Sequence, residues 1–307
     1  MTLFEVKSMI SRDLCLLLDS IRKKKNISMN DFVFDVVSLR QYKRYLYGTS
    51  EMPYKIFMDL SNKLNVDPMQ ILLEIEKSKV KQLNKLDTLF QLVTSQNMKS
   101  AMELAKEIEN EGIIDTSNNI YFEITKLMIE FNQDQAPNHY YANKCANLID
   151  YPNILKADSL NPIELFSLTI LLNFVSTDEK NTIIKKVSQV INSNTFTFLN
   201  KNNRIMIYMY VKLAKEYGIL KEFDEVIKIC NKAIKFLENI DSHFNLDYFY
   251  YYLSLVYRNK EDHEKAHDYV RQLYYVLKVK NNPNKLKHFD ALILKDFGFT
   301  FDELKVM

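Results

Sequence analysis

Glycine is scarce in this chain, and the scarcity constrains the fold more than any other feature of the sequence. Only four of the 307 residues are glycine, and six are proline. Sheets joined by tight turns, and glycine-rich phosphate loops, need glycine for backbone conformations that other residues rarely adopt. Leucine, isoleucine, lysine, glutamate and asparagine recur instead at helical spacing. We therefore expect an all-α protein, long enough for two domains and a large buried core.

Two short helices joined by a tight turn are expected near the N-terminus. Ser28 is placed to cap a helix over residues 29–36, and Ser38 to cap a second helix over residues 39–47. Gly48 then supplies a left-handed residue that ends the second helix. This is the layout of a helix-turn-helix.

A third helix is expected to brace the first two. Pro53 stands where the first residue of a helix should be, and the helix reaches residue 64. The apolar positions of the three helices would form one small core, made by Phe32, Val36, Tyr42, Tyr45, Ile56, Leu60 and Leu64.

The opposite face of the second helix carries long hydrogen-bond donors suited to DNA phosphates and base edges. These donors are Arg40, Gln41, Lys43 and Arg44, with Ser38 positioning the helix. Between residues 20 and 50 there are seven basic and two acidic residues, although the whole chain has a net charge of only +2. The local surplus favours a few phosphate contacts with double-stranded DNA.

From about residue 14 to residue 74 the chain resembles the Cro/repressor-like (XRE) family of DNA-binding domains. The run from Lys43 to Gly48 matches the end of that family's recognition helix. Two positions depart from the pattern: Met29 replaces a glutamine that touches phosphate, and the turn at Val36 is one residue short. A domain that has lost DNA binding, or a plain helical hairpin with a basic face, is therefore the alternative.

A linker helix is expected after a short helix over residues 69–76. No proline or glycine interrupts residues 77–92, so this segment is not a flexible tether. Its narrow apolar stripe, made by Val80, Leu83, Leu86, Leu89 and Phe90, could pack on the next domain or on a second copy of the chain. We place a helix-turn-helix domain at 1–76, a linker helix at 77–96 and a third region at 97–307.

Beyond residue 97, predicted helices of similar length alternate with short polar breaks, which is typical of a solenoid of stacked helix pairs. They cover residues 98–110, 120–132, 138–150, 162–175, 178–193, 203–217, 223–240, 246–259, 263–280 and 286–297.

Two segments that begin at Tyr210 and Tyr250 repeat one pattern at a distance of 40 residues. In each, Tyr-x2-Leu-small-x2-Tyr is followed by a second helix with small or apolar residues at its crossing positions. This spacing resembles the tetratricopeptide (TPR) pattern, whose period is about 34 residues. We attribute the longer period to the loop at 241–244. An irregular bundle with aromatic core positions is the alternative to a TPR-like α-solenoid.

No constellation of residues supports an enzyme. His263 to His267 spell HExxH, the zinc-binding motif of metalloproteases. However, Ala266 is already the small residue of the repeat, the flanks are polar, and no third ligand follows at a recognisable spacing. We read this segment as a surface helix. No nucleophile pair or phosphate-binding glycine loop is present, so we expect no catalytic site, no metal and no cofactor.

The first helix of each TPR pair lines the concave side of such a stack. With Tyr210 and Tyr250 as equivalent positions, several polar side chains should face inward. A groove with these donors suits a short extended peptide, although tyrosines at helical spacing are more often core. The candidate peptide contacts are Asn173, Tyr208, Lys215, Tyr248, Tyr251 and Arg258.

A helix-turn-helix domain followed by TPR-like helices resembles the RRNPP family of peptide-sensing transcriptional regulators. The resemblance implies a homodimer that binds operator DNA and a short signalling peptide in the concave groove, as in quorum sensing. Three widely spaced cysteines, no signal-peptide profile and no membrane span point to the cytoplasm. The rival interpretation is a Rap-like or scaffold TPR interaction protein with a degenerate first domain.

Overall fold

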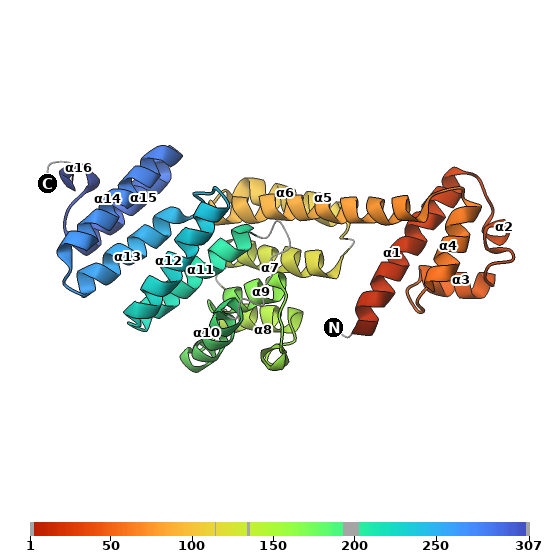
Figure 1. Ribbon diagram of the computed structural model, residues 1–307, viewed down its shortest axis with the longest axis horizontal. Helices are drawn as coiled ribbons and strands as arrows, with labels where there is room; N and C mark the ends of the chain where they lie inside the picture. Colours follow the sequence, from red (N-terminus) through yellow and green to blue (C-terminus); the bar gives the residue numbers. More distant parts are fainter. Residues whose placement is uncertain (1–2, 114, 134–135, 193–202, 305–307) are drawn as a thin grey trace. The chain divides into compact units, whose positions relative to one another are not determined.

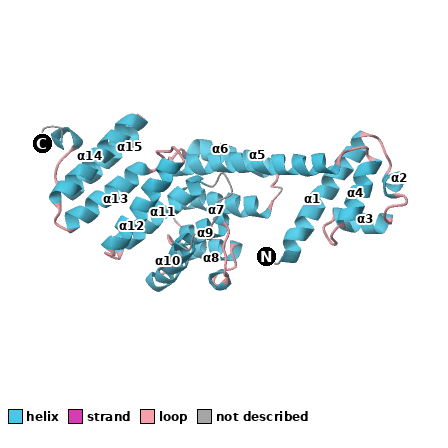
Figure 2. Cartoon of the chain, viewed as in Figure 1, coloured by secondary structure: helices cyan, strands magenta, loops and turns pink. Residues whose placement is uncertain are grey.

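The structure is a computed structural model that describes residues 3–113, 115–133, 136–192 and 203–304. Throughout these residues the chain forms helices and loops without a strand (Figure 2). The prediction of an all-α fold is confirmed. The chain divides into two compact units, Met1–Gln135 and Ala136–Met307.

The first unit begins with a small helical domain (Figure 1). Its helices are α1 (Leu3–Lys24), α2 (Met29–Val33), α3 (Leu39–Leu46) and α4 (Tyr54–Lys63). The Ser28 hydroxyl accepts the backbone N–H of Asp31 at 3.1 Å, and the Ser38 hydroxyl accepts that of Gln41 at 3.2 Å. Both predicted caps are therefore present, and α2 and α3 form the predicted helix-turn-helix.

The helix α2 is shorter than the predicted helix over residues 29–36. It ends at Val33, and Asp35 adopts a left-handed backbone conformation with φ of 59°. Such a residue cannot continue a right-handed helix. The side chain of Val36 still packs against the core, which explains why its spacing resembled that of one more helical residue.

The core of this domain contains the residues predicted for it, together with side chains from α1. Phe32 and Tyr42 meet edge to face with ring centroids 5.5 Å apart. Val36 and Ile56 are partly buried at its margin, whereas the other five predicted residues are fully buried. Cys15 and Leu18 of α1 complete the core. Sequence reasoning missed α1, because no capping signal or motif marks it.

A single long helix, α5 (Pro68–Thr94), follows the small domain. The Asp67 carboxylate accepts the N–H of Met69 at 2.9 Å and caps it. The predicted short helix over 69–76 and the linker helix are thus one continuous element. Its second half packs against α6 (Met98–Glu111) and α7 (Thr116–Gln133), burying the side chains of Leu86, Leu89, Phe90 and Val93.

The second unit consists of helices that pack on their successors in the chain (Figure 1). In order they are α8 (Asn138–Leu148), the 3-10 helix η1 (Asn153–Lys156), α9 (Pro162–Leu171), α10 (Thr177–Asn192), α11 (Asn203–Ile219), α12 (Phe223–Asn239), α13 (Leu246–Asn259), α14 (His263–Lys280), α15 (Pro283–Phe297) and α16 (Phe301–Leu304). The first helices of successive pairs also touch, since α11 packs on both α9 and α13. This is the predicted TPR-like α-solenoid.

The 40-residue repeat is visible in the backbone as well as in the side chains. Lys221 and Glu261 are 40 positions apart, and each adopts a left-handed conformation, with φ of 60° and 61°, in the turn between paired helices. The small residues Ala214 and Ser254 occupy the same place in the first helix of each pair, and both are fully buried. Their size lets the helix axes approach closely.

A buried carboxylate ties together three helices at the C-terminal end of the second unit. Asp247 of α13 is fully buried, and its carboxylate forms ion pairs with Lys280 at 3.1 Å and Lys285 at 2.6 Å. Burial lowers the pKa of Lys280, although Asp247 opposes that shift. Because the two lysines come from α14 and α15, these ion pairs fix the packing of the last helices.

Candidate functional site

The helix α3 presents its predicted DNA-contacting face to solvent. Arg40, Lys43 and Arg44 are exposed, whereas Tyr42 and Tyr45 on the opposite face are buried in the core. The buried rings fix the rotation of the helix about its own axis. Three permanent cations are thereby held outward on a rigid element, which is the arrangement that phosphate and base contacts require.

Gln41 and Ser38 differ from the three cations in their surroundings. Gln41 is half-buried, and its side-chain N–H donates to the Ser50 hydroxyl at 2.9 Å. Its amide oxygen accepts a bond from Arg44 at 3.3 Å, so Gln41 orients the arginine beside it. Ser38 is exposed at the helix N-terminus, where backbone N–H groups favour a phosphate.

The turns around α2 and α3 are held by cations that sequence reasoning did not single out. Lys63 Nζ donates to the carbonyl oxygens of Asp31, at 3.3 Å, and Phe34. Arg22 pairs with the Asp19 carboxylate at 2.8 Å and donates to the carbonyl of Ile27 at 2.5 Å. Some basic residues of this domain therefore fasten turns, and net charge alone does not distinguish them from those on the outward face of α3.

The predicted residue Asn173 is joined to a lysine that was not predicted. Lys212 Nζ of α11 donates to the Asn173 side-chain oxygen, linking the turn after α9 to α11. Burial, the largest cause, and the nearby Lys215 together lower the pKa of Lys212 to about 8. Lys215, another predicted contact, is exposed. A largely enclosed amine beside a second cation is electrostatically suited to an anionic group.

Tyr208 and Tyr248 lie close enough to influence each other. Burial raises the pKa of Tyr208, and Tyr248 adds to that effect. Tyr208 meets the ring of Phe166 at 5.9 Å between centroids, and Tyr248 meets the ring of Phe289 at 5.2 Å. Each tyrosine is partly exposed. The structure thus brings together two of the predicted residues from α11 and α13.

Tyr251 and Arg258 are engaged by α15, which Tyr248 also contacts through Phe289. The Tyr251 hydroxyl donates to the Asp296 carboxylate at 2.5 Å, and the residue is buried. Arg258 lies over the ring of Phe297, 5.2 Å from its centroid. Both predicted contacts are therefore already occupied by side chains of α15, and Tyr251 is held inside the protein.

The HExxH segment forms the first turns of α14, capped by Asp262. His263 is exposed, Ala266 is buried as the small residue of the repeat, and His267 packs edge to face against Phe299 at 5.3 Å. Among the described side chains, no group of three potential ligands could hold a metal ion. These contacts agree with the surface-helix interpretation.

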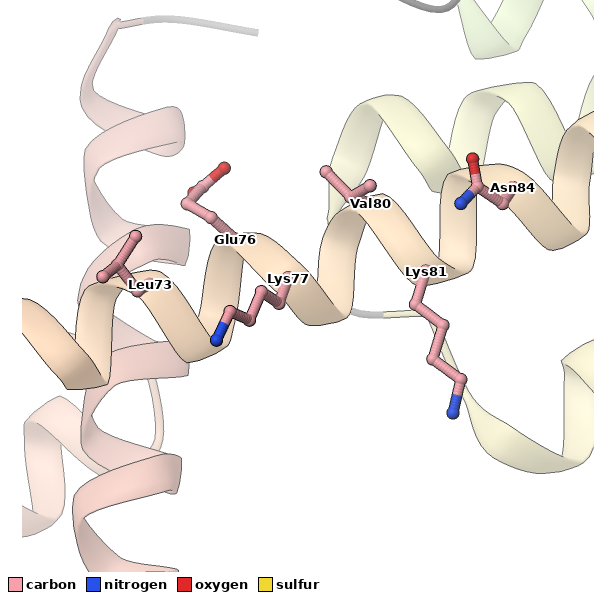
Figure 3. A pocket seen from close by; sticks show the side chains of 6 residues that line it. All are labelled: Leu73, Glu76, Lys77, Val80, Lys81 and Asn84. Atoms are coloured by element: carbon pink, nitrogen blue, oxygen red, sulfur yellow. The ribbon is translucent and has the colours of Figure 1, made fainter.

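An open hollow of about 360 Å³ runs along α5 (Figure 3). Leu73 and Val80 give it apolar walls, and Lys77 and Lys81 project on its other side. Val80 belonged to the predicted apolar stripe of the linker helix. The stripe is thus divided: its C-terminal part is buried under α6 and α7, and Val80 remains exposed.

In the described ranges, no helix combines the length and the apolar character needed to cross a bilayer. No protein-family model and no curated protein sequence matches the chain. The fold itself defines a class, namely a helix-turn-helix domain carried in the same chain as TPR-like helix pairs.

Solved structures of that class cover most of this chain. ComR from S. thermophilus, solved with DNA and its signalling peptide ComS, has 14% identity and a TM-score of 0.59 over 92% of this chain and 99% of its own. The apo form of the competence regulator ComR from Streptococcus vestibularis has 13% identity and a TM-score of 0.59 over 94% of this chain and 99% of its own. PlcR from Bacillus thuringiensis, solved with the peptide PapR7 and DNA, has 14% identity and a TM-score of 0.52 over 87% of this chain and 96% of its own. The fold is therefore the RRNPP-like fold that the sequence resemblance predicts.

Proposed function

We propose that this chain is a cytoplasmic transcriptional regulator whose DNA binding is controlled by a small signalling peptide. The observation that carries the proposal is the outward set of Arg40, Lys43 and Arg44 on a helix fixed by buried rings. The fold supports it, because the chain shares nearly its full length with two regulators solved with DNA and peptide.

For DNA, α3 is the element that enters the major groove in this proposal. Arg40, Lys43 and Arg44 supply contacts to bases and phosphates, Gln41 orients Arg44, and Ser38 lies at the phosphate-binding helix N-terminus. A homodimer would place two α3 helices on half-sites about 34 Å apart, or a multiple of that distance. The operator is then expected to be an inverted repeat.

For the peptide, the proposed site lies on the first helices of the pairs, α9, α11 and α13. Asn173 with Lys212, Lys215, and the Tyr208–Tyr248 pair offer donors for peptide carbonyls and carboxylates. Tyr251 and Arg258 remain proposed contacts, which a peptide reaches only by competing with Asp296 and Phe297. The peptide alters DNA binding by the difference in its affinity for two conformations, typically about 1–3 kcal/mol.

DNA binding is tested by selecting duplexes from a random pool with the purified chain and titrating the selected duplex against salt. We expect affinity to fall steeply as salt rises, because counterions are released from the DNA. Replacing Arg40, Lys43 and Arg44 together by alanine should abolish selection. A matched triple variant at the exposed Lys235, Lys287 and Lys295 should retain it.

Peptide control is tested by incubating the chain with a synthetic heptapeptide library, recovering bound peptides, and identifying them by mass spectrometry. A recovered peptide should change the affinity for the selected duplex by about 5- to 150-fold. Recovery of no peptide, together with intact DNA binding, would remove the sensor part of the proposal and leave the DNA-binding part standing.

A scaffold protein with a degenerate first domain is the second candidate, and Met29 favours it. In the related DNA-binding domains a glutamine touches phosphate at this position, whereas Met29 is half-buried and packs against the domain core. The salt titration separates the two functions. A scaffold is expected to bind duplex weakly at every salt concentration.

A further inference from the structure

The first unit contains a cleft of about 580 Å³ that the proposed regulator does not use. One wall is α1, the opposite wall is α5, and the segment after α6 closes one end. A volume of about 300–1,000 Å³ is typical of small-molecule sites. The lining residues are Arg12, Asp13, Leu16, Leu17, Ser20, Glu74, Ile75, Ser78, Glu111, Gly112 and Ile113.

Hydrogen bonds hold one side of the cleft in place. The Gln82 side chain of α5 donates to the carbonyl oxygen of Gly112 at 2.8 Å, which fixes the segment after α6. The Asn118 side chain of α7 donates to the carbonyl of Lys79 on α5 at 3.2 Å. The α5 wall and the closed end of the cleft are therefore pre-formed, as ligand sites commonly are, and α1 packs directly on α5.

The interior of the cleft is apolar, with one carboxylate that lacks a partner. The apolar side chain of Leu16 is 48% exposed. It lines the cleft beside Ile75 and Ile113. Asp13 is half-buried at the same wall. Within the described part of the chain, no hydrogen bond or ion pair satisfies the Asp13 carboxylate. A half-buried acid without a partner is unstable in its charged form.

Two cations near the cleft are paired with other carboxylates. Lys79 pairs with Glu76 at 3.2 Å, and Lys85 pairs with the lining residue Glu111 at 2.6 Å. The charges that act on the Asp13 carboxyl are Lys79 of α5, Asp115 at the start of the α7 segment and Arg12 of the same helix. Glu74 of α5 also lines the cleft. Carboxylates thus outnumber available cations around an apolar interior.

We propose that this cleft is a binding site for a small organic cation, an amine on an apolar body whose ammonium group pairs with the Asp13 carboxylate. The apolar part would cover Leu16, Ile75 and Ile113. A bound amine would join the first helix of the helix-turn-helix domain to α5. This site is separate from the proposed peptide site and does not depend on it.

The affinity for such a cation should depend on pH. Burial is the largest cause that raises the pKa of Asp13, and Asp115 adds to it while Lys79 and Arg12 oppose it, with a resulting pKa of about 6. Below pH 6 the carboxyl is mostly neutral and offers the ammonium group no ion pair. Binding should therefore strengthen as pH rises from 5 to 7.5.

Three probes with one apolar body test the proposal: 2-phenylethylammonium, 2-phenylethanol and phenylacetate, each titrated into the full chain by calorimetry. We expect the cation to bind, the neutral alcohol to bind at least about tenfold more weakly, and the anion not to bind. Asp13→Asn should lower the affinity for the cation to the affinity for the alcohol. Asp158→Asn, at an exposed aspartate of the second unit, should change nothing.

A second variant tests the cleft without touching its charge. Ser78 lines the cleft on α5, and Ser78→Phe should fill it and exclude both the cation and the alcohol. Equal binding of the cation and the alcohol, unchanged binding in Asp13→Asn, or no binding of the cation at millimolar concentration would each overturn the proposal. DNA selection by the same protein is unaffected by any of these outcomes, so failure here is distinct from failure of the regulator function.

Discussion

The helix α3, for which DNA reading is proposed, and the first helices of the TPR-like pairs use polar side chains in opposite ways. On α3, Arg40 and Lys43 are exposed and depend on one helix for their direction. On α11 and α13, polar side chains bond to residues of neighbouring helices, as Lys212 does to Asn173 and Tyr251 does to Asp296. A site on one helix follows from local periodicity, whereas a site shared by several helices depends on packing that no local pattern records.

Among the tests of this comparison, the largest change in stability is expected on removal of the buried Asp247 carboxylate of the second unit. Asp247→Ala leaves Lys280 and Lys285 close together without their common anion. We expect a loss of about 3–5 kcal/mol in the free energy of unfolding, measured by urea denaturation. Asp224→Ala removes an ion pair with Lys260 whose carboxylate is 91% exposed, and it should cost less than about 1 kcal/mol. Equal losses in the two variants would contradict the assigned role of burial.

On α3, whose cations are exposed, Arg44→Ala should weaken DNA binding without changing the free energy of unfolding. Arg44 is solvent-exposed and bonded only to Gln41 among the described residues. We expect a loss of about 1–3 kcal/mol in binding free energy, measured by gel-shift titration with the selected duplex. Arg271→Ala, at another exposed arginine that bonds to a residue of its own helix, is the matched control. Unchanged DNA binding in Arg44→Ala would remove that residue from the site.

Because the Lys212 amine is enclosed, the free energy of unfolding should depend on pH. Its pKa falls from 10.5 to about 8 on folding, chiefly through burial. Between those values the unfolded chain retains a proton that the folded chain has lost, so this residue makes stability rise with pH. From pH 7.5 to 9.5 the native chain should gain about 2 kcal/mol relative to Lys212→Met. Lys235→Met, at an exposed lysine, should show no such trend. Parallel stability curves for the native chain and Lys212→Met would contradict the shift.

The smallest effect is expected at a polar group without a partner in the helix-turn-helix core. The Tyr42 hydroxyl is buried, and no described residue bonds to it. Tyr42→Phe keeps the ring and removes the unsatisfied group, which should raise the free energy of unfolding by about 0.5–1 kcal/mol. Tyr121→Phe removes a hydroxyl that donates to Asp87 at 3.1 Å and should lower it by a similar amount. A loss of stability in Tyr42→Phe would show that its hydroxyl has a partner in solution.

The sequence predicted α2, α3 and their caps because the signals are local. Ser28 and Ser38 act within three residues of themselves, and the tyrosines of α3 repeat at helical spacing. The end of α2 was wrong by three residues, because the left-handed Asp35 carries no composition signal as strong as a glycine. The helix α1 was missed for a related reason, since its contribution to the core appears only when α1 packs on α3.

The candidate peptide residues show where sequence reasoning ends. Repeat alignment selected Tyr208 and Tyr248 from equivalent positions, and the structure brings them close together. It could not select Lys212, because the repeat alignment does not assign that position to the inward face and its partner Asn173 is 39 residues away. Nor could it foresee that Asp296 and Phe297 of α15 engage Tyr251 and Arg258. The predicted domain boundaries and the assignment of these side chains to a peptide remain predictions.

The unbroken course of α5 has a mechanical consequence. Its 27 residues extend for roughly 40 Å at 1.5 Å each, and beyond its first residue, Pro68, no proline or glycine provides a place to bend. Such a rod acts as a lever arm. A tilt of a few degrees at the end packed against α6 and α7 displaces the other end, where Pro68 follows the helix-turn-helix domain, by several ångström. Inserting a flexible glycine pair at its midpoint would uncouple the two ends while leaving each one folded.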